Sequence, residues 1–204
     1  MHFNIRLGAT LTAMLLCFIC NGQSHIEAFR KQLSESSRNI NTIVCDFTQT
    51  SCMAVLASEV NKKGEFTCCK PGNILLAFED GDFIKLTDKS FAVKSAGKTM
   101  SRNINSNPML KELKKILSAC MTGNLDAVSS EFEITVAQNS RTYDITLIPL
   151  KDRAMTMVKS IEMAFDRSDM SLSILKMNEP SGDYIKYTFI NKRFNTIVNE
   201  NLFN

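Results

Sequence analysis

Two short patterns in the sequence have the spacing of a serine nucleophile and a lysine base. Ser95 and Lys98 stand three positions apart, and so do Ser173 and Lys176. In hydrolases that use this pair, both side chains lie on one face of a helix. Here both pairs fall in or beside segments with strand-like alternation, where positions i and i+3 face opposite sides. We therefore interpret both pairs as chance matches.

Other catalytic residue types are equally isolated. Glu131 and Glu133 alternate with Phe132 and Ile134, which indicates a strand whose carboxylates face solvent. His25 is the only histidine beyond position 2 and belongs to a predicted helix. The sequence contains no phosphate-binding loop, nucleophile elbow, zinc-protease helix, dinucleotide fingerprint or EF-hand loop. We expect no enzyme activity, no cofactor and no metal site.

Cysteines are the remaining reactive side chains. Five follow position 22, namely Cys45, Cys52, Cys68, Cys69 and Cys120. An odd number without zinc-knuckle spacing fits neither a disulfide scaffold nor a structural zinc site, so most should be small buried hydrophobic residues. Symmetric pairing of the first predicted hairpin places Cys45 opposite Cys68, as neighbours that require no disulfide.

The composition is that of an ordinary globular protein, and the N-terminal residues have the pattern of a secretion signal. The 204 residues are 44% hydrophobic with a net charge of +3 and no block of like charges, which disfavours a polyanionic partner. Arg6 precedes an uncharged apolar run over residues 7–20, which is shorter than the roughly 20 residues of a membrane span. We expect a cleavable signal peptide at 1–22 and a single domain at 23–204, with an uncleaved anchor as the alternative.

Alternating apolar residues dominate the rest of the chain. Strands are predicted at 42–50, 64–70, 73–79, 82–87, 90–95, 131–138, 141–149, 158–166, 172–177, 183–190 and 194–198. One amphipathic helix is predicted at 24–39. A second is predicted at 108–121, with Asn107 as its N-cap, Pro108 at its first position and Gly123 after its end. The pattern predicts an α+β fold: about eleven antiparallel strands in a sheet that must curl or close, covered by helices.

Several short motifs resemble the periplasmic lipoprotein carrier family (LolA). They are Phe47-Thr-Gln49, Gly64-Glu-Phe66, Lys70-Pro71, Phe78, Leu147-Ile-Pro149, Ile161-Glu-Met-Ala-Phe-Asp166 and Asn201-Leu-Phe203. The resemblance implies an incomplete β-barrel closed by helices around an apolar cavity for acyl chains. It also implies a periplasmic carrier that receives lipoproteins from an inner-membrane lipoprotein-releasing transporter and passes them to an outer-membrane acceptor.

The chain departs from the family pattern at two points. Lys70 stands where the family usually has an arginine that bonds to the lid, so its single ammonium is a latch candidate without the forked donor set. Ile74 stands where a bulky aromatic is usual, and the sequence contains no tryptophan. A solvated turn lysine is the alternative for Lys70.

Period-two alternation assigns residues to the expected cavity. They are Phe47, Phe66, Ile74, Leu76, Phe78 and Phe189. On the central helix, Met109, Leu113, Ile116 and Leu117 form an apolar lid stripe, with Lys111, Lys114 and Lys115 on the opposite, solvent side. A plain core helix and ordinary two-sided burial are the alternatives.

The leading functional expectation is a monomeric carrier and chaperone for lipoprotein acyl chains. A binding module or sensor of the same fold, specific for another lipid or amphiphile, is the second. A hydrolase of an unrecognised kind is the third.

Overall fold

The computed structural model describes residues 25–53, 58–150 and 158–203. The expected signal peptide at 1–22 lies outside these residues. In the described part of the chain, no helix has both the length and the hydropathy that a membrane crossing requires.

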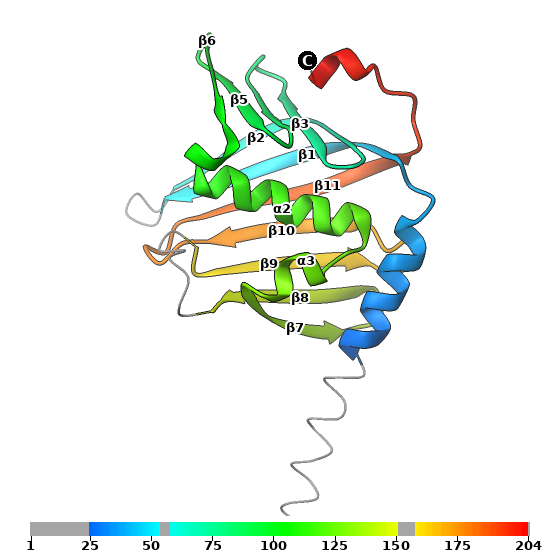
Figure 1. Cartoon of the computed structure of the whole chain (residues 1–204). Helices are drawn as coiled ribbons and strands as arrows, with labels where there is room; N and C mark the ends of the chain where they lie inside the picture. Colours follow the sequence, from blue (N-terminus) through cyan, green and yellow to red (C-terminus); the bar gives the residue numbers. More distant parts are fainter. Residues whose placement is uncertain (1–24, 54–57, 151–157, 204) are drawn as a thin grey trace, which may run out of the picture.

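A single antiparallel sheet of eleven strands forms the body of the protein (Figure 1). The strands are β1 Thr42–Met53, β2 Ser58–Cys69, β3 Asn73–Phe78, β4 Phe83–Leu86, β5 Ser90–Ser95, β6 Lys98–Asn103, β7 Phe132–Gln138, β8 Thr142–Pro149, β9 Ser160–Asp166, β10 Leu172–Asn178 and β11 Tyr184–Phe194. Their spatial order is β6-β5-β4-β3-β2-β1-β11-β10-β9-β8-β7. The first strand, β1, therefore pairs with the last strand, β11, and β6 and β7 are the two edges of the sheet. The sheet is open, and the predicted fold class is confirmed.

The strand count agrees with the prediction, but two strands differ. β6 was not predicted because its six residues are all exposed and carry no apolar alternation. It pairs with β5 through a two-residue turn at Ala96 and Gly97, both with positive φ. The separate strand predicted at 194–198 is wrong, because β11 continues to Phe194 and the chain then leaves the sheet.

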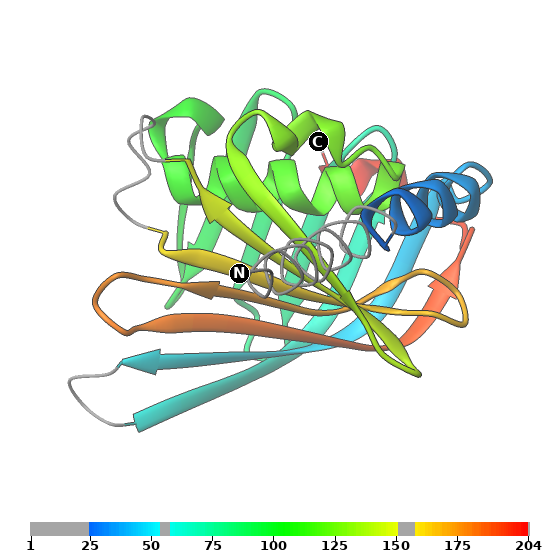
Figure 2. The same cartoon turned by 90° about the horizontal axis from the view of Figure 1, so that it is seen from below.

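Helices cover one face of the curled sheet (Figure 2). The N-terminal helix (residues 25–37) runs beside the ends of β7 to β10, and α2 (Pro108–Thr122) lies over the sheet, followed by the short α3 (Asp126–Ser129). Asn107 caps α2 by accepting a bond from the Leu110 N–H, and Gly123 ends it in the left-handed region, as predicted. Two 3-10 turns, η2 (Ile104–Ser106) and η3 (Glu200–Phe203), complete the described elements.

The face of the sheet under these helices, called here the inner face, is largely apolar. Neighbouring strands align their side chains in rows: Phe47 lies opposite Gly64, and Gly64 opposite Phe78. The same register brings Tyr143, Phe165 and other buried residues of β7 to β10 onto this face. The core is therefore one layer, formed where the inner face meets the helices.

The hairpin register corrects two sequence interpretations. Cys68 pairs with Ile43, and Cys45 pairs with Phe66, so the predicted Cys45 and Cys68 pairing is wrong by two residues. Both thiols still face the same side of the sheet, because a shift of two preserves the side-chain period. Ser95 and Lys98 pair directly across the β5-β6 turn rather than facing opposite sides, although both are exposed.

Candidate functional site

An apolar pocket lies between the inner face and the C-terminal ends of the two covering helices. Its lining comes from the N-terminal helix and the residues after it (Leu33, Ser36, Ser37, Ile40), from β1 and β2 (Ile43, Cys45, Phe66, Cys68), from α2 (Leu117, Cys120, Met121), and from the β9-β10 turn, β10 and β11 (Met170, Ser171, Leu172, Phe189, Lys192, Phe194). Its free volume is about 50 Å³. Pockets that hold small ligands measure roughly 300–1,000 Å³, so this one is nearly filled by its own side chains.

All six predicted cavity residues lie on the inner face, but they occupy three different positions. Phe66 and Phe189 line the pocket, with ring centroids 5.0 Å apart. Phe47 and Phe78 form a second, edge-to-face pair at 5.2 Å, outside the pocket lining. Ile74 and Leu76 are 0% and 1% exposed and belong to the packed core.

The predicted lid stripe on α2 is the buried face of that helix. Leu113, Ile116 and Leu117 are buried in the core cluster, while Met109 is partly buried at the first turn. Of these four, Leu117 reaches the pocket, and the next turn adds Cys120 and Met121. The C-terminal half of α2 therefore covers the pocket.

The lysines of α2 do not all face solvent, which corrects the sequence interpretation. Lys114 Nζ lies 2.9 Å from Asp88 Oδ1 in the β4-β5 turn. Lys115 Nζ lies 2.7 Å from Glu131 Oε2, so Glu131 is not the solvated carboxylate that was expected. Only Lys111 is exposed as predicted. The helix is thus tied to the rim of the sheet by ion pairs that helical periodicity alone does not reveal.

Lys70 contacts the N-terminal helix rather than the lid. Its Nζ donates a hydrogen bond of 2.6 Å to the backbone oxygen of Ser37, which is the last residue of that helix. The peptide dipoles place partial negative charge at this end, so a lysine there stabilises the helix terminus. The contact that sequence analysis assigned to the lid or its flanking loop is therefore a C-terminal cap on the other covering helix.

Two glycines bring the covering elements into close contact. Gly123 has φ of +70°, and a Cβ there would lie 2.8 Å from the Leu33 oxygen and closer still to Ser37 Oγ. Gly72 packs under α2, where a Cβ would lie 2.7 Å from Ser118 Oγ. These approaches join the N-terminal helix, α2 and the β2-β3 turn above the pocket.

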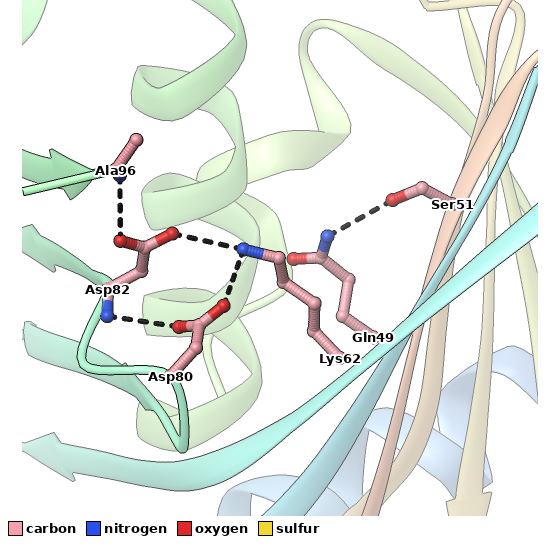
Figure 3. Close-up of polar contacts among 6 residues, drawn as sticks. All are labelled: Gln49, Ser51, Lys62, Asp80, Asp82 and Ala96. Atoms are coloured by element: carbon pink, nitrogen blue, oxygen red, sulfur yellow. Dashed lines mark hydrogen bonds and ion pairs between the residues drawn. The ribbon is translucent and has the colours of Figure 1, made fainter.

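A polar cluster ties strands together at another part of the inner face (Figure 3). Lys62 Nζ lies 2.8 Å from Asp80 Oδ2 and 3.0 Å from Asp82 Oδ2, and Asp82 also accepts a bond from the Ala96 N–H. These contacts raise the pKa of Lys62 and lower that of Asp80, chiefly through their mutual hydrogen bond. The cluster joins β2 to the β3-β4 and β5-β6 turns, so this end of the face is polar while the pocket end is apolar.

The pocket thiols are unsuited to nucleophilic chemistry. Burial raises the pKa of Cys45 to about 12 and that of Cys120 to about 12, and it raises the pKa of Cys68 as well. A thiol must ionise to act as a nucleophile or metal ligand, and these remain protonated at neutral pH. Among the described residues, no group of three or more His, Cys, Asp or Glu is arranged to hold a metal ion.

Lys192 is the functional candidate that sequence reasoning missed. Val44 pairs with Arg193 and Asp46 with Ile190, so two residues of β11 oppose Cys45 alone. This bulge, with Asn191 at φ of +54°, brings Lys192 to the pocket while Arg193 pairs with Glu65 on the other face. Simple alternation cannot reveal it, because a bulge resets the side-chain period.

The described residues thus form an open, curled antiparallel sheet whose apolar face is covered by helices, with a mainly apolar pocket between them. Residues 38–204 match the family described as outer membrane lipoprotein carrier protein LolA, and the chain belongs to this family. No curated protein sequence matches the chain significantly.

Several solved structures are similar to this chain at low sequence identity. An uncharacterised conserved protein from Thermus thermophilus has a TM-score of 0.50 and 6% identity, over 85% of this chain and 89% of that chain. A DUF1329 family protein from Desulfovibrio piger has a TM-score of 0.49 and 9% identity, over 88% and 97%. A LolA superfamily protein from Nitrosomonas europaea has a TM-score of 0.44 and 7% identity, over 87% and 96%.

Proposed function

We propose that this protein is a periplasmic carrier that binds the acyl chains of lipoproteins against its inner face. In this proposal it is exported by the leader at 1–22 and works as a monomer formed by one domain, 23–204. It accepts lipoproteins from an inner-membrane transporter and delivers them to an outer-membrane acceptor. The alternative is a sensor or binding module for another amphiphile.

The observation that best supports this proposal is the apolar pocket closed by α2 and the N-terminal helix. A free volume of about 50 Å³ is too small for an acyl chain, so a ligand must displace one of its covers. In this proposal α2 is the cover that moves, while the N-terminal helix stays in place through Phe29, which is 0% exposed and packs on Tyr143 and Phe165. In this role Phe66 and Phe189 contact the ligand first, and Phe47 and Phe78 only after the helix has moved.

The energies of opening and binding are of the same size. Exposing Leu113, Ile116 and Leu117 would cost roughly 5–9 kcal/mol at about 1.5–3 kcal/mol for each side chain. Each buried methylene contributes about 0.8 kcal/mol, so burying roughly 6–11 methylenes offsets that cost. Because α2 also buries Ala119, Cys120 and Met121, the bound acyl chains must bury more surface than these three side chains lose, and loss of the ligand closes the helix without any fuel.

The test is native mass spectrometry of the protein purified from the envelope of its host. A bound triacylated peptide supports the carrier, and a different amphiphile supports the alternative. Protein that is empty and binds neither class when they are added contradicts both.

A matched pair of variants assigns any binding to the pocket. Ile43→Glu places a carboxylate in the partly buried lining, whereas Ile148→Glu makes the same change on the exposed side of β8. We expect only the first to lose the ligand.

A further inference from the structure

Lys192 is the only charged residue among the described side chains that line the pocket. The bulge in β11 places it there. In a regular strand, alternation from the inward-facing Phe189 would put Lys192 on the outer face, and the extra residue opposite Cys45 reverses this. The other polar residues of the lining are Ser36, Ser37 and Ser171, and the rest of the lining, including Ile43 and Phe66, is apolar. The pocket is therefore asymmetric, with an apolar interior and one cationic point.

The hydrogen bonds of Lys192 leave part of its donor capacity unused. Its Nζ donates to Ser171 Oγ at 2.6 Å and to Ser173 Oγ at 2.9 Å. An ammonium has three donors, and among the described residues Lys192 forms no ion pair. The third donor and the uncompensated charge are available to a ligand.

Two carboxylates near Lys192 are already occupied by their own turn. Asp169 accepts bonds from the Ser171 N–H and hydroxyl, and Asp166 accepts bonds from the Ser168 N–H and hydroxyl. Burial lowers the pKa of Lys192, and the charges of Asp169 and Asp166 offset this only in part. An anion in contact with Lys192 would offset the same desolvation directly.

We propose that Lys192, held in place by the Ser171 and Ser173 hydroxyls, binds the anionic headgroup of an amphiphile whose acyl chain occupies the apolar pocket. The inference rests on the acyl-binding part of the proposed function and favours its alternative, another amphiphile, because the triacylated end of a lipoprotein carries no anionic group. Carboxylate and phosphate headgroups share the required chemistry, since each presents anionic oxygens to an ammonium. Ligands in which the charge directly follows the chain are favoured over uncharged ones.

The test compares laurate, lauroyl lysophosphatidylglycerol and lauryl alcohol by calorimetric titration. The wild type should bind the two anions at least about tenfold more tightly than the alcohol, the ratio that corresponds to about 1.4 kcal/mol. Preference for only one of the anions identifies whether carboxylate or phosphate is the natural group. Equal affinity for all three overturns the headgroup site but leaves acyl binding intact, whereas no binding of any of them contradicts the proposed function itself.

Three variants locate the effect. Lys192→Met should remove the preference for anions while leaving affinity for lauryl alcohol within about twofold, which also shows that the pocket has folded. Lys192→Arg should retain the preference. Arg193→Met is the matched control, because it removes a neighbouring cation that pairs with Glu65 away from the pocket. A Lys192→Met protein that still prefers laurate over lauryl alcohol refutes the assignment.

Discussion

Lys114 Nζ lies 2.9 Å from Asp88 Oδ1, and this contact ties α2 to the turn between β4 and β5. Only 14% of the Lys114 side chain is exposed, so the helix keeps this lysine against the rim of the sheet instead of in solvent. With the Lys115 pair to Glu131, it holds the cover of the pocket from two sides. Any opening of α2 must break these ties.

We expect removal of the ties to loosen α2 in the empty protein. Partly exposed ion pairs contribute about 0.2–1 kcal/mol each, so Lys114→Met with Lys115→Met should speed hydrogen exchange in 108–122 by a few fold. Lys111→Met, a change on the exposed side of the same helix, should not. Unaltered exchange in the double variant would show that the pairs do not hold the helix.

Ligand binding should move α2 more than the N-terminal helix. When a triacylated peptide saturates the protein, acyl chains replace the contacts of Leu113, Ile116 and Leu117, so residues 108–122 should lose protection from hydrogen exchange. Residues 25–37 should change less, because Phe29 stays packed between Tyr143 and Phe165. Unchanged protection of 108–122 at saturation would rule out the lid role.

Lys70→Met should fray the end of the N-terminal helix. The lost bond to the Ser37 oxygen and the lost charge at the helix terminus together correspond to about 1 kcal/mol of unfolding free energy. Lys70→Arg should recover most of this, and Lys63→Met, at an exposed lysine of β2, should cost little. If urea unfolding does not distinguish Lys70→Met from Lys63→Met, the cap is energetically unimportant.

Glu112 should make the protein less stable as the pH rises. The residue is 7% exposed, its Oε1 has no hydrogen-bond partner among the described residues, and burial raises its pKa above the usual 4.5. Between the usual and the raised pKa, the folded state binds more protons than the unfolded state, so the unfolding free energy falls with increasing pH across that window.

Glu112→Gln should flatten this pH dependence, while Glu133→Gln, at an exposed position of β7, should leave it unchanged. Chemical unfolding at a series of pH values measures both slopes. A Glu112→Gln slope equal to that of the wild type would assign the dependence to other groups.

Gly123→Ala should destabilise the joint between the two covering helices. The left-handed φ alone costs an alanine about 1 kcal/mol, and the contact of a Cβ with the Leu33 oxygen adds to it. Gly81→Ala is the matched control, because Gly81 has φ of +85° and no atom within 4 Å of a built Cβ. The unfolding free energy lost by Gly123→Ala minus that lost by Gly81→Ala measures the close packing of the N-terminal helix against the end of α2. Equal losses in the two variants would mean that these helices move apart at no cost.

Local sequence signals were sufficient for most of the elements and for the side that each residue of a regular strand faces. Asn107, Pro108 and Gly123 define α2 because capping depends on residues within one turn. Phe47, Phe66, Phe78 and Phe189 share the inner face because alternation along a regular strand fixes the side of each residue. The α+β class followed from these two signals together.

Tertiary structure decided the features that depend on how one segment pairs with another. Cys45 and Cys68 came into diagonal positions because hairpin register depends on the turn, and β6 formed because β5 provides a partner for an exposed segment. Lys192 reached the pocket through a bulge between β1 and β11, nearly 150 positions apart in sequence. Lys70, Lys114 and Lys115 found their partners in the same way, since a side chain's charge is encoded locally but the atoms that surround it are brought there by the fold.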